Sequence, residues 1–310
     1  MDVVIIGAGA AGMGAALYLA REGLDVVVYE KGAMGGVLMQ IANLLNYPGW
    51  SGSGAELAKK MREQVEGFGA KFEYGEATSV SGDLLRQDLR SSLDVSQNTS
   101  HSGAQPFLES HPDTEVAKPL ITCIIDGQEV SARAVLVATG NEPKKLELPG
   151  VASERISYCA TCDGPLYRGK SVLVVGGGNS ALQEALHLAE FADKVTVVNR
   201  SELKASVELV SQAEKSEKIE ILTEIDPVEY AREHQFDGYF AFIGVVPSAE
   251  FLGPEVLDKG YVVTDDKYMT GIAGVFAAGS VRAGGVNQVI TSVAEGAEAA
   301  IHISKWLRAI

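Results

Sequence analysis

Two stretches of the chain share one pattern: a short apolar strand, a glycine-rich turn and the start of a helix. In the first, residues 2–6 lead into a turn with glycines at 7, 9 and 12, and then into a helix over 13–21. In the second, residues 171–175 lead into a turn at 176–181 and a helix that runs to residue 190. Such strand–turn–helix units bind dinucleotide phosphates in doubly wound α/β proteins. The repeat predicts an α/β chain with two Rossmann-like three-layer nucleotide-binding domains.

The first turn has every part of a dinucleotide site. Gly7 permits a tight turn, Gly9 lets the backbone approach a pyrophosphate, and Gly12 permits close packing of helix on strand. The next strand, 25–29, ends at Glu30, which lies 21 residues after Gly9 and can accept hydrogen bonds from a ribose. A glycine triplet alone also fits a plain structural turn. The agreement of strand, helix and acid favours a nucleotide.

The second turn is less complete. Its second strand, 194–198, ends at Asn199 and Arg200 rather than at an acidic residue. Two interpretations stay open: a second nucleotide site, or an inherited scaffold that binds no ligand. If a ligand binds, the candidate residues are Gly176, Gly178, Asn179, Ser180 and Arg200.

Cys159 and Cys162 lie between these two turns, and Cys162 precedes Gly176 by 14 residues. Two thiols at this spacing can store two electrons as a disulfide, with one attacking a substrate disulfide and the other resolving it. Asp163 follows directly, either as a general acid or base or as a helix-capping residue. A zinc site would need more ligands than Cys123 and five unclustered histidines offer, so no metal is expected. Between two nucleotide turns, the pair points to a flavin-linked disulfide reductase.

Composition narrows the class further. A net charge of -15 argues against nucleic acid and anionic membranes as partners. No apolar run reaches the roughly 18 residues of a transmembrane helix, and the N-terminus lacks the basic leader of a signal peptide. Only three cysteines occur in 310 residues, which indicates a reducing cytoplasm.

The order of the patterns predicts a discontinuous first domain, at 1–145 and 246–310, with a smaller domain inserted at 146–245. Asp126 and Gly127 between short apolar runs predict a hairpin, and Cys123 beside them is expected to be an inert core residue. The polar stretch 91–110 is expected to be a surface excursion.

The residues 157–164, SYCATCDG, followed by the turn GGGNSA at 176–181, closely resemble the low-molecular-weight thioredoxin reductases. The turns at 7–12, 46–49, 138–140 and 277–279 fit the same family. The resemblance implies an FAD domain, a smaller pyridine-nucleotide domain that carries the cysteine pair, and a homodimer. It also implies that the smaller domain rotates on linkers at 143–149 and 246–248.

The same resemblance implies roles for individual residues. Cys162 faces the flavin, Cys159 attacks the disulfide of a thioredoxin-like partner, and Asp163 handles the proton. The residues expected to bind FAD are Gly7, Gly9, Ala10, Ala11, Gly12, Glu30, Lys31, Gly35, Gly36, Asn46, Ala138, Thr139, Gly140, Gly279, Ser280, Gln288 and Val289.

The chain departs from the family where NADPH is recognised. NADPH-dependent members have a His-Arg-Arg cluster and a further arginine after the second strand, which bind the 2′-phosphate. Here Asn199-Arg200-Ser201-Glu202 stands in that place, Ala205 occupies the later arginine position, and only Lys204 partly compensates. About 45 residues join Arg200 to Gly244, fewer than the family usually has.

The flavin side departs less. Ser280 replaces the usual aspartate of the ribityl site, Asn287 replaces an arginine, and Val37 replaces a glutamine. FAD binding is still expected, because the phosphate and ribose elements are intact.

We therefore expect an FAD-dependent, thioredoxin-reductase-like enzyme whose donor is not NADPH. Ferredoxin, a deazaflavin or a second bound flavin are the candidate donors, although the net charge disfavours ferredoxin, itself usually acidic. NADH lacks an acidic partner for its ribose, because Asn199 stands at the strand end. Two alternatives remain: a flavin-binding redox sensor with little turnover, and a ferredoxin–pyridine-nucleotide reductase on the same fold.

Overall fold

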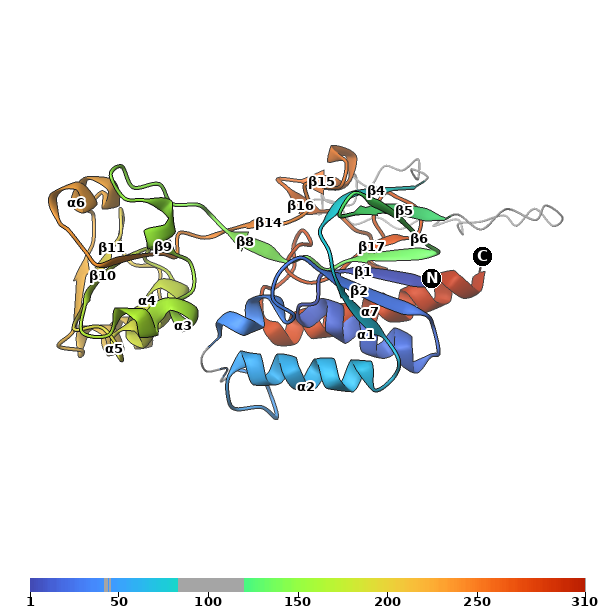
Figure 1. Cartoon of the computed structure of the whole chain (residues 1–310), viewed down its shortest axis with the longest axis horizontal. Coiled ribbons are helices and arrows are strands. Elements are labelled where there is room, and N and C mark those ends of the chain that lie inside the picture. Colours follow the sequence, from blue (N-terminus) through green and yellow to red (C-terminus); the bar gives the residue numbers. More distant parts are fainter. Residues whose placement is uncertain (42–43, 45, 83–119, 310) are drawn as a thin grey trace, which may run out of the picture. The chain divides into compact units, whose positions relative to one another are not determined.

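The computed structural model describes residues 1–41, 44, 46–82 and 120–309. These form two compact units, each with its own parallel sheet (Figure 1). Unit 1 comprises Met1–Gly36, Leu57–Gly140 and Pro247–Ile310. Unit 2 comprises Val37–Glu56 and Asn141–Val246.

Unit 1 is built on a five-stranded parallel sheet in the order β17-β7-β1-β2-β3. Its strands are β1 (Val3–Ile6), β2 (Val26–Glu30), β3 (Lys71–Tyr74), β7 (Ala134–Val137) and β17 (Val275–Ala277). The strands β1, β7 and β17 are buried throughout, as their continuously apolar sequences require in a sheet covered on both faces.

Three layers make up unit 1. On one face of the parallel sheet, Val3 and Ile5 pack with helices α1 (Ala10–Arg21) and α7 (Val289–Ala309). On the other face, Val4 and Ile6 pack against a three-stranded antiparallel sheet. That sheet consists of β4 (Ala77–Ser81), β5 (Ile121–Ile125) and β6 (Gln128–Ala132). The unit also contains η5 (Pro254–Val256), β15 (Leu257–Asp258), β16 (Tyr261–Val262) and most of α2 (Gly54–Glu66), whose first residues belong to unit 2. The alternation of strand residues between the two cores follows from the two-residue repeat of a β-strand.

Unit 2 has a second five-stranded parallel sheet, in the order β12-β11-β10-β13-β9. Its strands are β9 (Ile156–Ser157), β10 (Ser171–Val175), β11 (Lys194–Val198), β12 (Ile219–Leu222) and β13 (Gly238–Ala241). Its helices are α3 (Ala160–Asp163), α4 (Asn179–Leu188), α5 (Val207–Glu214), α6 (Pro227–Glu233) and the 3-10 helices η1 (Gly36–Gln40), η3 (Ser153–Arg155) and η4 (Gly164–Tyr167). Val172 and Val174 pack with α4 on one face, and Leu173 and Val175 contribute to a separate core on the other.

A two-stranded pair, β8 (Asn141–Pro143) and β14 (Val245–Pro247), lies where the chain enters and leaves unit 2. The predicted fold class, two Rossmann-like three-layer units with the second inserted into the first, is therefore confirmed. The segment Val37–Glu56, which we assigned to the first domain, groups with unit 2.

The local predictions hold with shifts of a few residues. The hairpin at Asp126 and Gly127 joins β5 to β6, and both residues have the positive φ angles, 48° and 76°, of such a turn. The first helix begins at Ala10 rather than at residue 13, because the turn itself ends in helical conformation directly after Gly9. The stretch 91–110 lies outside the described residues. Within the part of the chain that is described, no helix has the length and apolar character needed to cross a membrane.

Candidate redox site and nucleotide turns

The first turn lies at the carboxyl end of β1 and has the close contacts that its glycines predict. Gly7 has a φ of 106°, and a Cβ there would lie 2.4 Å from the carbonyl oxygen of Ala138. A Cβ at Gly12 would lie 1.9 Å from the carbonyl oxygen of Gly7. Gly9 differs, since a Cβ there would meet nothing within 4 Å, and Gly9 caps α1 without a side-chain hydrogen bond. The turn therefore leaves space and free helix N–H groups where an anion would bind.

Other predicted cofactor residues gather around this turn. The backbone N–H of Gly35 donates to the carbonyl of Ala8 at 3.0 Å. A Cβ on Gly36 would lie 3.3 Å from Cα of Gly9. These contacts place the Gly35–Gly36 loop directly over the turn.

The C-terminal candidates reach the same edge of the sheet. A Cβ on Gly279 would lie 2.8 Å from Cβ of Ala11, and a Cβ on Gly140 would lie 3.4 Å from the Ser280 hydroxyl oxygen. Val289 begins α7, and the Gln288 carbonyl accepts from the N–H of Ser292. The structure thus brings together chain segments that are more than 250 residues apart in sequence.

Glu30 ends β2 beside the turn, as predicted. One carboxylate oxygen accepts from the N–H of Ala8 and the other from the N–H of Gly32, both at 2.8 Å. Lys31 pairs with Glu76 at 3.4 Å on the surface. Asn46 lies in the segment that groups with unit 2, so the structure does not place it with the other candidates.

The second turn repeats the backbone geometry of the first. Gly176 has a φ of 141°, and a Cβ there would lie 2.4 Å from the carbonyl oxygen of Phe242. Gly178 corresponds to Gly9: a Cβ would meet nothing within 4 Å, and it caps α4 without a side-chain hydrogen bond. The backbone of unit 2 is therefore built like a nucleotide turn.

The side chains after β11 are engaged with the protein itself. The amide of Asn199 donates to the carbonyls of Ser201 at 2.7 Å and Glu202 at 3.1 Å. Arg200 forms an ion pair with Asp226 at 3.2 Å. The side-chain oxygen of Asn179 accepts from the N–H of Ser206 at 2.8 Å. Of these candidates, the one cation is thus paired with an acid.

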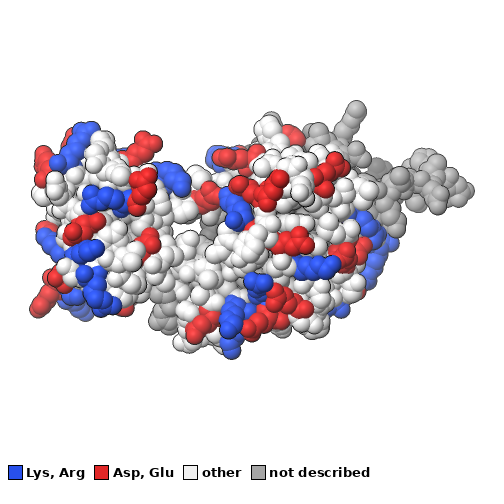
Figure 2. Space-filling model, in the orientation of Figure 1, with Lys and Arg blue, Asp and Glu red and all other residues white. Residues whose placement is uncertain are grey.

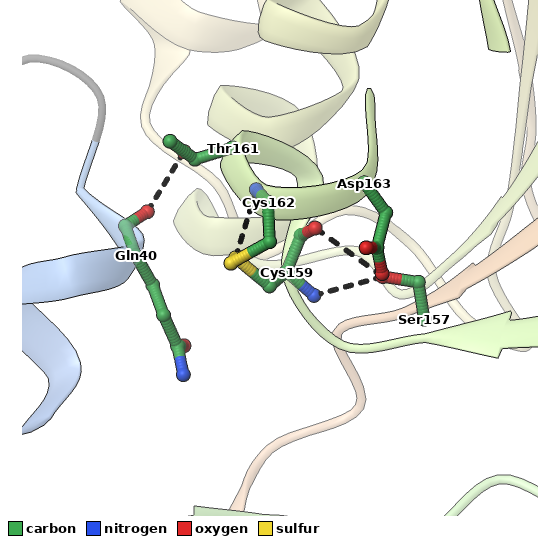
Figure 3. The surroundings of a disulfide bond; sticks show 6 residues. All are labelled: Gln40, Ser157, Cys159, Thr161, Cys162 and Asp163. Carbon is green, nitrogen blue, oxygen red and sulfur yellow. Dashed lines mark hydrogen bonds between the residues drawn. A yellow bond between two sulfur atoms is a disulfide. The ribbon is translucent and has the colours of Figure 1, made fainter. Parts of the chain in front are cut away.

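Cys159 and Cys162 form a disulfide at the start of α3 (Figure 3). Cys159 is the N-cap residue of that helix, and its sulfur accepts from the N–H of Cys162 at 3.1 Å. The hydroxyl of Thr161 donates to the carbonyl of Gln40, which belongs to the same unit, at 2.9 Å. The predicted redox pair is therefore in place and oxidised.

Asp163 is connected to the cysteine pair through Ser157. The Ser157 hydroxyl donates to the Asp163 carboxylate at 2.7 Å and accepts from the N–H of Cys159 at 3.1 Å. Asp163 precedes η4 but its side chain makes no capping hydrogen bond there. The Asp163 side chain therefore does not cap η4, and its acid–base role stays a prediction.

Comparisons with known proteins agree with this arrangement. The family described as pyridine nucleotide-disulphide oxidoreductase matches residues 1–296. The chain is 36% identical to the thioredoxin reductase of Treponema pallidum, over 96% of this chain and 94% of that protein. The crystal structure of Lactococcus lactis thioredoxin reductase in its FR conformation is similar with a TM-score of 0.80 and 32% identity, covering 100% of this chain and 99% of that one.

The chain belongs to the pyridine nucleotide-disulphide oxidoreductase family.

Within the family it is a thioredoxin-reductase-like flavoprotein disulfide oxidoreductase, as the resemblance predicted. A crystal structure titled as a ferredoxin-flavin thioredoxin reductase, from Clostridium acetobutylicum, is also similar, with a TM-score of 0.52 and 26% identity over 100% of this chain and 98% of that one.

The third cysteine of this oxidoreductase behaves as a core residue. Cys123 is fully buried between β4 and β6, and burial raises its pKa to about 12. A thiol with so high a pKa is a poor nucleophile. Among the described residues, no three His, Cys, Asp or Glu side chains are grouped as a metal site would require.

Two residues near the cysteine pair, Ser157 and Glu184, were not identified from the sequence. Ser157 offers no signal beyond its nearness to the pair. Glu184 offers one, because it follows the buried Ala181 by three residues and precedes the buried Leu188 by four, so it borders the buried stripe of α4. A carboxylate that borders an apolar helical stripe indicates a role other than solubility.

Proposed function

We propose that this enzyme passes electrons from FAD to the Cys159–Cys162 pair and on to a thioredoxin-like protein disulfide, with a donor other than NADPH. In this proposal the domain at 1–145 and 246–310 binds FAD, and the domain at 146–245 carries the pair. In this proposal the residues that pass electrons to the substrate match those of the family, whereas the residues that would bind the donor differ.

FAD fits the residues present in unit 1. The open space over Gly9 and the uncapped start of α1 suit a pyrophosphate, and Glu30 lies beside the turn where a ribose would bind. Ser280 lies near Gly140, where its hydroxyl can replace the carboxylate usual in the family. When bound, the flavin supplies the two electrons that reduce the disulfide. We propose the seventeen residues named above as its binding set.

The proposed chemistry of the pair is thiol–disulfide exchange. The Cys159 thiolate attacks a sulfur of the substrate disulfide, which forms a mixed disulfide and releases a substrate thiolate. Cys162 then attacks Cys159, which restores the Cys159–Cys162 disulfide and releases the second substrate thiolate. Asp163 donates the proton that the leaving thiolate takes up. Ser157 holds the Asp163 carboxylate, through its hydroxyl, beside the N–H of Cys159.

The donor proposal rests on the residues that follow β11. NADPH recognition needs cations around the 2′-phosphate. Arg200 is already paired with Asp226, and the Asn199 side chain is bound to the loop that contains Glu202. A 2′-phosphate would meet Arg200, which is shared with Asp226, the carboxylate of Glu202 and, as partial compensation, Lys204. The absence of an acid at position 199 argues against NADH in the same way.

The remaining donors are ferredoxin, a deazaflavin and a second flavin in unit 2. The similarity to a protein titled ferredoxin-flavin thioredoxin reductase supports the first of these. The net charge of -15 does not, and basic and acidic side chains are interspersed on the face in Figure 2. The open backbone at Gly178 leaves a second flavin as a candidate.

Three further parts of the proposal follow the family resemblance. We propose that the enzyme is a homodimer, that it works in the cytoplasm, and that unit 2 rotates during turnover about the linkers at 143–149 and 246–248.

An anaerobic titration tests the donor proposal. The purified flavoprotein is mixed with NADPH, NADH, reduced ferredoxin or a reduced deazaflavin, and loss of flavin absorbance is followed. We expect rapid bleaching with one of the last two donors and slow bleaching with both nicotinamide cofactors. Rapid bleaching at micromolar NADPH would refute the proposal. Flavin stoichiometry after denaturation tests the second-flavin variant, since one FAD per chain excludes it.

A further inference from the structure

Glu184 lies on α4, the helix against which α3 packs. One of its carboxylate oxygens, Oε2, is fully buried and has no hydrogen-bond partner among the described residues. The carboxyl also interacts with the backbone N–H of Ala160, the first residue of α3. A buried carboxyl with one unpartnered oxygen is costly as an anion, so it is retained here at an energetic penalty.

The position of Ala160 connects Glu184 to the disulfide. Cys159 is flanked by two peptide N–H groups, its own and that of Ala160. Ser157 accepts the first at 3.1 Å, and Glu184 interacts with the second. Ser157 and Glu184 thus each interact with one of the two N–H groups beside Cys159, and of these two side chains only Glu184 can change its charge.

We propose that Glu184 is a positioning residue whose charge, acting through the Ala160 amide, controls how easily the Cys159–Cys162 disulfide is reduced. Its neutral form adds no negative charge beside the start of α3, which favours a Cys159 thiolate. Its anionic form places a negative charge beside the pair and disfavours that thiolate. The disulfide is then harder to reduce.

The relevant pH range follows from burial. Burial raises the pKa of Glu184 to about 7, against a smaller lowering by the Ala160 N–H. Below pH 7 the carboxyl is mainly neutral, and above pH 7 it is mainly charged. The neighbouring titratable and charged groups, on α4, just beyond its end and on the elements packed against it, are Asp163, Tyr167, His187, Glu190, Lys194, Glu208 and Glu214. A comparison of wild type with a variant at position 184 cancels their contribution, since both proteins contain them.

The inference rests on the proposed function only in requiring that the pair be redox-active. Equilibration with dithiothreitol therefore tests it without any donor or protein substrate. The reaction is protein disulfide plus dithiothreitol giving protein dithiol plus cyclic oxidised dithiothreitol, so atoms and electrons balance. Flavin-loaded wild type and Glu184→Gln are equilibrated at about pH 6 and about pH 8, one unit either side of that pKa. Acid quenching, alkylation and mass spectrometry give the fraction reduced.

We expect wild type and Glu184→Gln to agree within about twofold at the lower pH. At the higher pH, wild type should need a reduced-to-oxidised dithiothreitol ratio about three- to tenfold higher for half-reduction. The control Glu190→Gln removes an exposed charge just beyond α4 and should match wild type at both pH values. Glu184→Met, an apolar chain of similar length, replaces Glu184→Gln if that variant does not fold.

An equal shift at both pH values would show a purely structural role and overturn the inference. An absent shift would overturn it too. Either result leaves the proposed function standing, whereas a pair that dithiothreitol cannot reduce would contradict the proposed function itself.

Discussion

The two glycine turns of this enzyme have nearly the same backbone and different surroundings. Gly9 and Gly178 both cap a helix without side-chain help and both face open space. After the next strand, the first turn has Glu30, bound to two backbone N–H groups beside it. The second has Asn199, bound to its own loop, and Arg200, bound to Asp226. The comparison teaches that a nucleotide-type backbone and nucleotide-specific charges are separate properties.

The largest expected effect concerns the cysteine pair, through which electrons are proposed to reach the substrate. Cys159→Ser and Cys162→Ser should each lower disulfide reductase turnover by about a thousandfold or more, because neither single thiol can complete the exchange. Turnover is measured with a thioredoxin-like substrate, and FAD content serves as the control. Unchanged activity of both variants would contradict the disulfide-reductase proposal. Slow turnover of wild type with every donor would support the redox sensor.

A matched pair of variants tests the difference between the turns directly. Gly9→Ala adds a methyl group where a pyrophosphate would approach, and should weaken FAD binding by about 5- to 100-fold. Gly178→Ala adds the same group to the second turn and should leave FAD content at unit 1 unchanged. Neither added Cβ meets protein atoms within 4 Å, so both variants should fold. Equal FAD loss in the two variants would contradict the proposal that FAD binds at the first turn and not at the second.

Cations added after the second turn should improve the recognition of NADPH. Ser201→Arg combined with Glu202→Gln replaces a neutral and an acidic residue by the charge pattern that a 2′-phosphate needs. Reduction of the flavin at low NADPH concentration should become about 10- to 100-fold faster. NADH lacks the 2′-phosphate and serves as the control, with no change expected. A similar gain with NADH would show that the added charge does not act through the phosphate.

The sequence predicts the two turns better than it predicts the side-chain contacts around them. The close backbone contacts of Gly7 and Gly12 and the place of Glu30 beside the turn were predictable, because the pattern demands one residue type at each of these spacings. The Ser157–Asp163 contact depends on the path of the chain from β9 into α3, and the lack of a partner for Glu184 Oε2 among the described residues depends on how α4 packs, so neither could be predicted from local sequence. The helix after Gly9 was placed three residues late, because glycine and alanine there look like turn residues as readily as helix residues.

The smallest expected effect comes from Arg200→Ala. If Arg200 only pairs with Asp226 on the surface, turnover with the physiological donor should not change, and the melting temperature should shift little. Arg62→Ala, which breaks the exposed pair of Arg62 and Glu66 in unit 1, is the matched control. A clear loss of turnover specific to Arg200→Ala would show that this residue contacts a donor.

Equilibrium binding of NADPH to the flavin-loaded enzyme tests the central claim most directly, namely that the first turn holds its nucleotide and the second does not recognise NADPH. Cofactor release on denaturation gives the FAD content of the same sample. We predict bound FAD together with no saturable NADPH binding below about millimolar concentration, the range expected when a phosphate lacks its charged partners. Micromolar binding of NADPH that Arg200→Ala weakens would contradict the account.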